Sequence, residues 1–102
     1  MAYYTAAWNK AVQQGYVTTG TNGSAATDGL TKGWIIFEMC KMGLFTQDST
    51  AASTPYYNRA WQGAKNAGII SDSSTPSQVP NKGWIIFVLY KAGAFDLLES
   101  GS

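Results

Sequence analysis

A stretch of six residues occurs twice in this chain. Residues 32–37 read Lys-Gly-Trp-Ile-Ile-Phe, and residues 82–87 read the same. Around this hexapeptide, Thr31–Phe45 matches Asn81–Phe95 at nine of fifteen positions, six of them in the hexapeptide itself. Upstream, Tyr3–Gly15 and Tyr56–Gly68 share a Tyr-Tyr pair, a Trp, two Ala and a final Gly at equal spacing. A repeat of about fifty residues is typical of architectures in which one supersecondary unit is used again.

The upstream segments have the pattern of amphipathic helices. Residues 3–14 place their aromatic and small residues on one helical face and their polar residues elsewhere, and residues 56–67 do the same. Gly15 and Gly68 follow at the position where a helix ends in a left-handed residue. We therefore expect an inward face in each copy, formed by Tyr4, Ala7, Trp8 and Ala11 in the first and by Tyr57, Ala60, Trp61 and Ala64 in the second.

The segments that carry the hexapeptide are predicted to be helices that run to about Met42 and Ala92. Thr31 and Asn81 are good N-caps, and glycines follow the predicted C-terminal ends. Their residues are apolar on almost every side, which is normal for a central helix that has several neighbours. A buried strand can show the same apolar run. The length, the caps and the glycines favour a helix.

These elements predict a mainly α fold. We expect a tandem duplication of a helix–loop–helix hairpin, with about four main helices in one compact pseudo-twofold domain that spans residues 1–102. The first repeat covers residues 3–45 and the second covers 56–95, with a linker at 46–55 and a tail at 96–102. The repeats are expected to pack on each other through Trp8, Trp61 and the second helices. The polar loops, 18–30 and 71–80, differ in length by three residues.

The composition limits the classes of function. Seven Lys and Arg against six Asp and Glu give a net charge of +1, without the basic stripe of a nucleic-acid binder. No apolar run approaches the roughly 20 residues of a membrane span. The first residues lack the basic and apolar parts of a secretory signal, so we expect synthesis in the cytoplasm. The uncharged polar surface suits a protein within an assembly, such as a virion, and it also suits an ordinary soluble domain.

The sequence offers little for catalysis, so we expect no enzyme activity, no cofactor and no metal. There is no histidine, and the single cysteine, Cys40, has Tyr90 as its counterpart in the second repeat. We interpret Cys40 as a small hydrophobic core residue. The six carboxylates form no duplicated acid–base pair, and no Cys/His cluster has zinc-ligand spacing.

Four duplicated residues are the candidate binding residues: Lys32, Trp34, Lys82 and Trp84. They stand at the start of each second helix, beside a loop of Ser, Thr and Gly. In one interpretation each Trp packs in the core and each Lys is a solvated residue near the helix cap. In the other they form an aromatic and cationic patch, where an indole stacks on a sugar or a partner side chain and the Lys meets an anionic group.

Each repeat resembles the S-layer homology repeat, a helix–loop–helix of about 55 residues. Trp61, Ala64 and the run Gly68-Ile69-Ile70 follow the first part of that pattern. The segments 30–34 and 80–84 fall on its Ile-Thr-Arg-Ala-Glu hallmark, with Lys in the place of Arg and Trp in the place of Glu. Lys91-Ala92 continues like the family's later Arg-Ala pair. The resemblance implies helical hairpins and a role in clasping anionic cell-wall polysaccharide.

Two functions therefore stand as hypotheses. In the first, the chain is a non-enzymatic structural or interaction protein that docks on a larger protein assembly or on itself, for example a phage-type virion accessory or decoration protein. In the second, it is a glycan-binding module like the S-layer homology repeats. A secretion signal or a third repeat in the native gene would favour the second, and neighbouring genes for capsid or tail proteins would favour the first.

Overall fold

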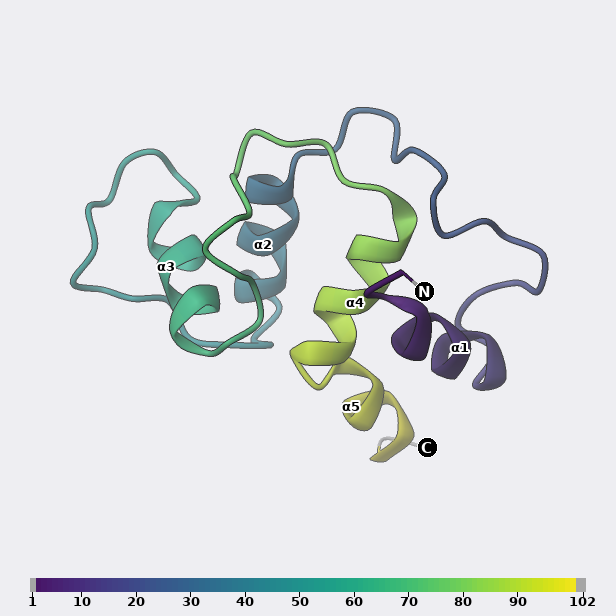
Figure 1. Cartoon of the computed structure of the whole chain (residues 1–102). Helices are drawn as coiled ribbons and strands as arrows, with labels where there is room; N and C mark the ends of the chain where they lie inside the picture. The colour runs from purple at the N-terminus through teal and green to yellow at the C-terminus, as the bar shows by residue number, and fades with distance from the viewer. Residues whose placement is uncertain (1, 101–102) are drawn as a thin grey trace. The chain divides into compact units, whose positions relative to one another are not determined.

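The computed structural model describes residues 2–100, and its regular structure is helical (Figure 1). There are five helices within that range: α1 Thr5–Gln13, α2 Lys32–Lys41, α3 Asn58–Asn66, α4 Lys82–Lys91 and α5 Ala94–Ser100. No strand occurs among these residues, and a single isolated bridge joins Ala26 and Asn81. The predicted mainly α fold with about four main helices is confirmed, and the two hexapeptide segments are helices.

The chain is divided into two units that do not coincide with the two sequence repeats. Unit 1 contains the residues up to Asp28 and those from Pro80 onward, and unit 2 is Gly29–Val79. In unit 1, α1 packs on α4, and α5 comes directly after α4 in the chain and also contacts it. In unit 2, α2 packs on α3. Each packed pair thus combines the first helix of one repeat with the second helix of the other. This differs from a hairpin in which the two helices of one repeat pack together.

Backbone hydrogen bonds explain this pairing. The first N–H groups of a helix have no partner inside the helix. In unit 1, the N–H groups of Lys82 and Gly83 donate to the carbonyl oxygens of Ala25 and Gly23, at 3.0 and 2.7 Å. The loop that follows α1 therefore binds the start of α4, almost sixty residues further along the chain.

Unit 2 uses the same arrangement at the start of α2. The N–H groups of Lys32 and Gly33 donate to the carbonyl oxygens of Gln78 and Pro76, at 2.8 and 2.9 Å. The third N–H group of each helix is satisfied by the predicted N-cap. Trp34 N donates to Thr31 Oγ1 at 3.2 Å, and Trp84 N donates to Asn81 Oδ1 at 2.8 Å.

The glycine of the hexapeptide is needed because the loop and a tyrosine ring come so close to the helix. A Cβ atom on Gly83 would lie 2.6 Å from ring atoms of Tyr4, and one on Gly33 would lie 3.0 Å from Pro76 Cβ and 3.2 Å from Tyr57 Cγ. Both glycines are buried. The Lys-Gly-Trp sequence is thus the signature of a helix start that is covered by a loop.

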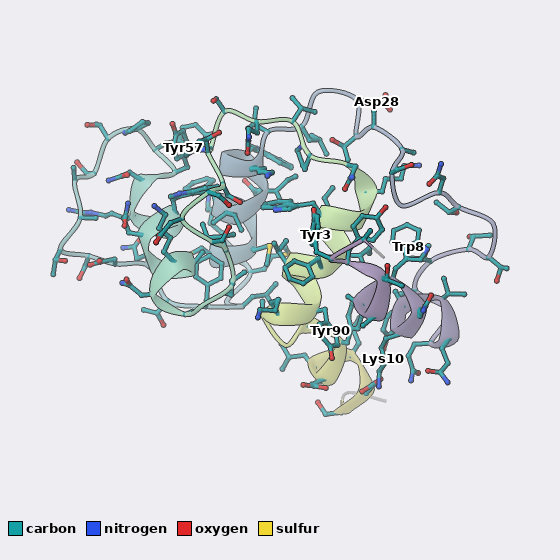
Figure 2. The ribbon with its side chains drawn as sticks, viewed as in Figure 1. Tyr3, Trp8, Lys10, Asp28, Tyr57 and Tyr90 are labelled. Atoms are coloured by element: carbon teal, nitrogen blue, oxygen red, sulfur yellow. The ribbon has the colours of Figure 1, made fainter. Side chains whose placement is uncertain are left out.

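Both units also contain the same chain of aromatic contacts between their two helices. The ring of Tyr3 lies edge-on to Phe87 with centroids 5.1 Å apart, and Lys91 Nζ lies 5.9 Å from the Phe87 centroid (Figure 2 labels Tyr3). In unit 2 the matching contacts are Tyr56 to Phe37 at 4.9 Å and Lys41 Nζ to Phe37 at 5.1 Å. The duplicated Tyr and Phe residues therefore link the two packed segments of each unit, and each Lys–Phe contact lies within one helix.

The predicted inward faces are buried to different degrees. In unit 2, Ala60, Trp61 and Ala64 are all buried, and the exposed fraction of Trp61 is 3%. In unit 1, Ala7 and Ala11 are buried, but Trp8 is only half-buried. Trp61 is thus a core residue as expected, whereas Trp8 reaches the surface.

The glycines that were predicted to end the four main helices do so. Gly15, Gly43, Gly68 and Gly93 all have φ between 77° and 85°. After α1, the N–H of Gly15 donates to Val12 O and that of Tyr16 donates to Ala11 O, which is the Schellman pattern. The chain therefore turns sharply at each helix end.

The linker and the tail have more structure than their composition predicted. The linker packs along α3, where Arg59 Nε donates to Ala51 O and a Cβ on Gly63 would collide with Thr46 O. Most of the predicted tail belongs to α5, which is anchored by the buried Phe95. Residues 101–102 of that tail lie outside the described residues.

Candidate functional site

The candidate site is a pocket in unit 1 between α1, the loop that follows it and the first turns of α4. Its volume is about 300 Å³. Its wall is mainly apolar, with two threonines and one lysine, and consists of Trp8, Tyr16, Val17, Thr18, Thr21, Lys82, Ile85 and Ile86. Figure 2 shows Trp8 projecting from α1 at this wall. An apolar cavity of about half this volume can hold benzene, so the pocket has room for a large apolar side chain.

The same place in unit 2 is filled. The residues of unit 2 at the corresponding repeat positions are Trp61, Ile69, Ile70, Ile35 and Ile36, and all five are buried. Their counterparts in unit 1, from Trp8 to Ile86, are only half-buried or exposed. Two copies of one arrangement therefore differ, because one has a closed core and the other has an opening.

Two of these five positions differ between the repeats, with Tyr16 and Val17 in the places of Ile69 and Ile70. Ile69 is 3% exposed, whereas its counterpart Tyr16 is 37% exposed. The Tyr16 ring lies 5.1 Å from the ring of Phe95, centroid to centroid, and is therefore drawn toward α5. A phenol also keeps its hydroxyl near water more readily than an aliphatic side chain can. Neither Tyr16 nor Val17 is thus buried as its counterpart in unit 2 is.

A second difference concerns the two lysines. Lys32 Nζ donates to Gln78 Oε1 at 3.0 Å, and partial burial lowers the pKa of this lysine. The residue of unit 1 that corresponds to Gln78 is Ala25, which has no side-chain acceptor. Lys82 is exposed at the pocket and forms no side-chain hydrogen bond or ion pair within residues 2–100. The open pocket of unit 1 therefore has an available positive charge at its edge, whereas the matching position of unit 2 has a lysine that is bound to Gln78.

The four predicted binding residues are divided between the units, with one Lys and one Trp in each. Lys32 and Trp34 belong to unit 2, while Lys82 and Trp84 belong to unit 1. Two positions apart on a helix, each Lys and its Trp point in different directions. Trp34 is 43% exposed, Trp84 is 5% exposed, and only Lys82 lines the pocket.

The remaining pocket residues were not among the predicted binding residues. Trp8, Ile85 and Ile86 were expected in the core because they are apolar and duplicated. The signal that could have located the pocket is the comparison of the repeats at their differing positions. Tyr16 and Val17, in place of Ile69 and Ile70, line the pocket, and Ala25 in place of Gln78 leaves a lysine available. The three extra residues of the first loop lie after Ala25 and are not part of the pocket wall.

The polar groups of the pocket wall come from Trp8, Tyr16, two threonines and one lysine. In residues 2–100 no three His, Cys, Asp or Glu side chains come together as metal ligands would. Cys40 lies in unit 2, is half-buried rather than buried, and has its Sγ 3.6 Å from Phe45 O. Burial raises the pKa of its thiol, which disfavours the reactive thiolate. What the pocket itself offers is an apolar hollow beside a cation.

Comparisons with known proteins give no relative: no family model matches the chain, and neither do curated proteins or solved structures. Within residues 2–100, none of the helices has the length and apolar character that crossing a membrane requires.

Proposed function

We propose that this chain is a non-enzymatic interaction protein that docks on a larger protein assembly through the pocket of unit 1. A phage-type virion accessory or decoration protein is the example that suits its small size and its low charge. The observation that carries the proposal is the open apolar pocket beside Lys82, at a place where unit 2 has a filled core. An opening of this kind costs apolar burial, so a protein that only had to fold would gain stability by closing it.

The pocket also indicates the chemistry of the partner. Its wall is mainly apolar, which suits an aliphatic or aromatic side chain. Lys82 then attracts a carboxylate close to that side chain, at the modest strength of an exposed ion pair. The partner feature that fits is a large apolar residue next to Asp or Glu on a protein surface. A cell-wall polysaccharide, the alternative from the repeat pattern, would meet two threonine hydroxyls, the phenol of Tyr16, the indole N–H of Trp8 and the lysine as polar partners.

A nuclear magnetic resonance titration tests this proposal on the intact chain. The probes are an acetylated and amidated Leu-Asp dipeptide, the same dipeptide with Asn in place of Asp, and a glucuronate-containing oligosaccharide. We expect the acidic dipeptide to shift the indole N–H signal of Trp8 at millimolar concentration, and the Asn dipeptide to bind more weakly. Lys82→Ala should weaken binding of the acidic dipeptide about two- to fivefold. Lys32→Ala, at the matched position of unit 2, should leave it unchanged.

The outcomes separate the two functions. Saturable binding of the oligosaccharide with no response to either dipeptide would replace protein docking by glycan binding. Equal effects of the two lysine substitutions would mean that the difference between the units has no role in binding. No Trp8 response to the acidic dipeptide would refute the pocket as the docking site.

A further inference from the structure

The short helix α5 carries an exposed surface that complements the pocket. Leu97 and Leu98 are 59% and 58% exposed, so two adjacent apolar side chains lie at the surface. Asp96 precedes them and is exposed, and its side chain forms no hydrogen bond or ion pair within the described residues 2–100. The other carboxylate of this helix, Glu99, is turned toward α1, where its Oε1 lies 3.7 Å from Lys10 Nζ. The exposed side chains of α5 therefore include two leucines and one carboxylate, and Leu97 is adjacent to both of the others in the sequence.

We infer that the pocket of one copy receives α5 of a second copy, with Leu97 in the apolar hollow and Asp96 beside Lys82. This inference rests on the proposed docking function and names the partner of the same site. The support is that the two surfaces are complementary in polarity and in charge. The pocket is an apolar space with an available cation, and α5 has exposed apolar side chains and an available anion. The low net charge of +1 offers little repulsion between copies.

Such a contact joins the pocket of one copy to α5 of the other, which are two different surfaces. One pocket and one α5 in the pair therefore stay unused. The first copy in a pair still has an exposed α5, and the second still has an open pocket. Contacts of this kind are heterologous and extend into rings or filaments rather than closing as a symmetric dimer. A helix of 7 residues buries far less than the roughly 1,200 Å² of a stable interface. We therefore expect a dissociation constant on the order of 0.1–1 mM in solution, which an assembly of many copies would strengthen.

Sedimentation equilibrium of the full chain over about 0.05–2 mM is the first measurement. We expect the average mass to rise above that of one chain as the concentration increases. Lys82→Glu and Asp96→Lys should each weaken the association about tenfold, because each replaces an attraction by a repulsion. Both changes in one chain should restore it. Lys32→Glu is the matched control in unit 2 and should have no effect. Glu at the first position of a helix is favourable, so folding is preserved.

Mixing two variants tests the direction of the contact. A Lys82→Glu chain keeps its α5, and a chain with Leu97→Gln and Leu98→Gln keeps its pocket. Each alone should associate about tenfold more weakly than the parent chain, and their mixture should form pairs with the parent affinity that grow no further. A chain that stays monomeric at 2 mM, an equal effect of Lys32→Glu, or a mixture without pairs would overturn the inference. The dipeptide titration can still succeed in each of these cases, so the proposed function is judged separately.

Discussion

Trp8 and Trp61 occupy the same position in the two repeats, and their substitution by alanine should have very different costs. Trp61 is 3% exposed and belongs to the filled core of unit 2. Truncation of a buried Trp removes its transfer free energy and leaves a cavity, at a cost of about 3–5 kcal/mol. A chain of this size has a total stability of about 5–15 kcal/mol, so Trp61→Ala should come close to unfolding unit 2.

Trp8→Ala should cost clearly less, about 1–2 kcal/mol, because Trp8 is half-buried beside an existing opening and already has part of its surface in water. Urea denaturation followed by circular dichroism at 222 nm measures both variants without relying on tryptophan fluorescence. Equal losses for the two variants would refute the difference that we describe between the filled and open units. A loss below about 1 kcal/mol for Trp61→Ala would place that indole at the surface.

Three further predictions concern the linker, the unit boundaries and pH. Gly63→Ala should destabilise by more than about 1 kcal/mol, although Ala normally stabilises a helix interior, because its Cβ would collide with Thr46 O; a gain in thermal stability would contradict the contact. A fragment of residues 29–79 should show more helix by circular dichroism than one of residues 1–50, since only the former contains a packed helix pair; equal helicity would contradict the pairing. Hydrogen bonds from Thr50 lower the pKa of Asp48 below its usual value of 3.8. The stability that the charged Asp48 contributes is therefore present above pH 3.8 and is lost as the pH falls through the lowered pKa. Asp48→Asn should reduce the loss of stability in acid, and an unchanged dependence of stability on pH would contradict this prediction.

Local structure could be predicted from the sequence because local signals specify it. The N-caps Thr31 and Asn81, together with the four glycines of left-handed conformation, fix where the main helices begin and end. The apolar periodicity also identified Trp61 as a core residue. These features depend on interactions within a few residues, which a sequence pattern displays directly.

The pairing of the helices could not be predicted in the same way. It depends on which loop carbonyls reach the first turns of α2 and α4, and both repeats have an equivalent loop and an equivalent helix start. The identical Lys-Gly-Trp sequences are therefore compatible with pairing inside a repeat or between repeats. The location of the pocket was missed for a related reason. It arises where the repeats differ, at Tyr16 and Ala25, whereas the prediction relied on residues that they share.

The division of the chain between the two units also sets the order in which they can form during synthesis. About 17 residues separate α2 from α3, so unit 2 can fold soon after α3 leaves the ribosome. About 70 residues separate α1 from its partner α4, and at roughly 5–20 residues per second their synthesis takes several seconds. Helix pairs with local contacts fold within milliseconds. Of these four helices, α1 is thus made first and is the last to find its partner, and its buried face is open to water or to chaperones until α4 has left the ribosome.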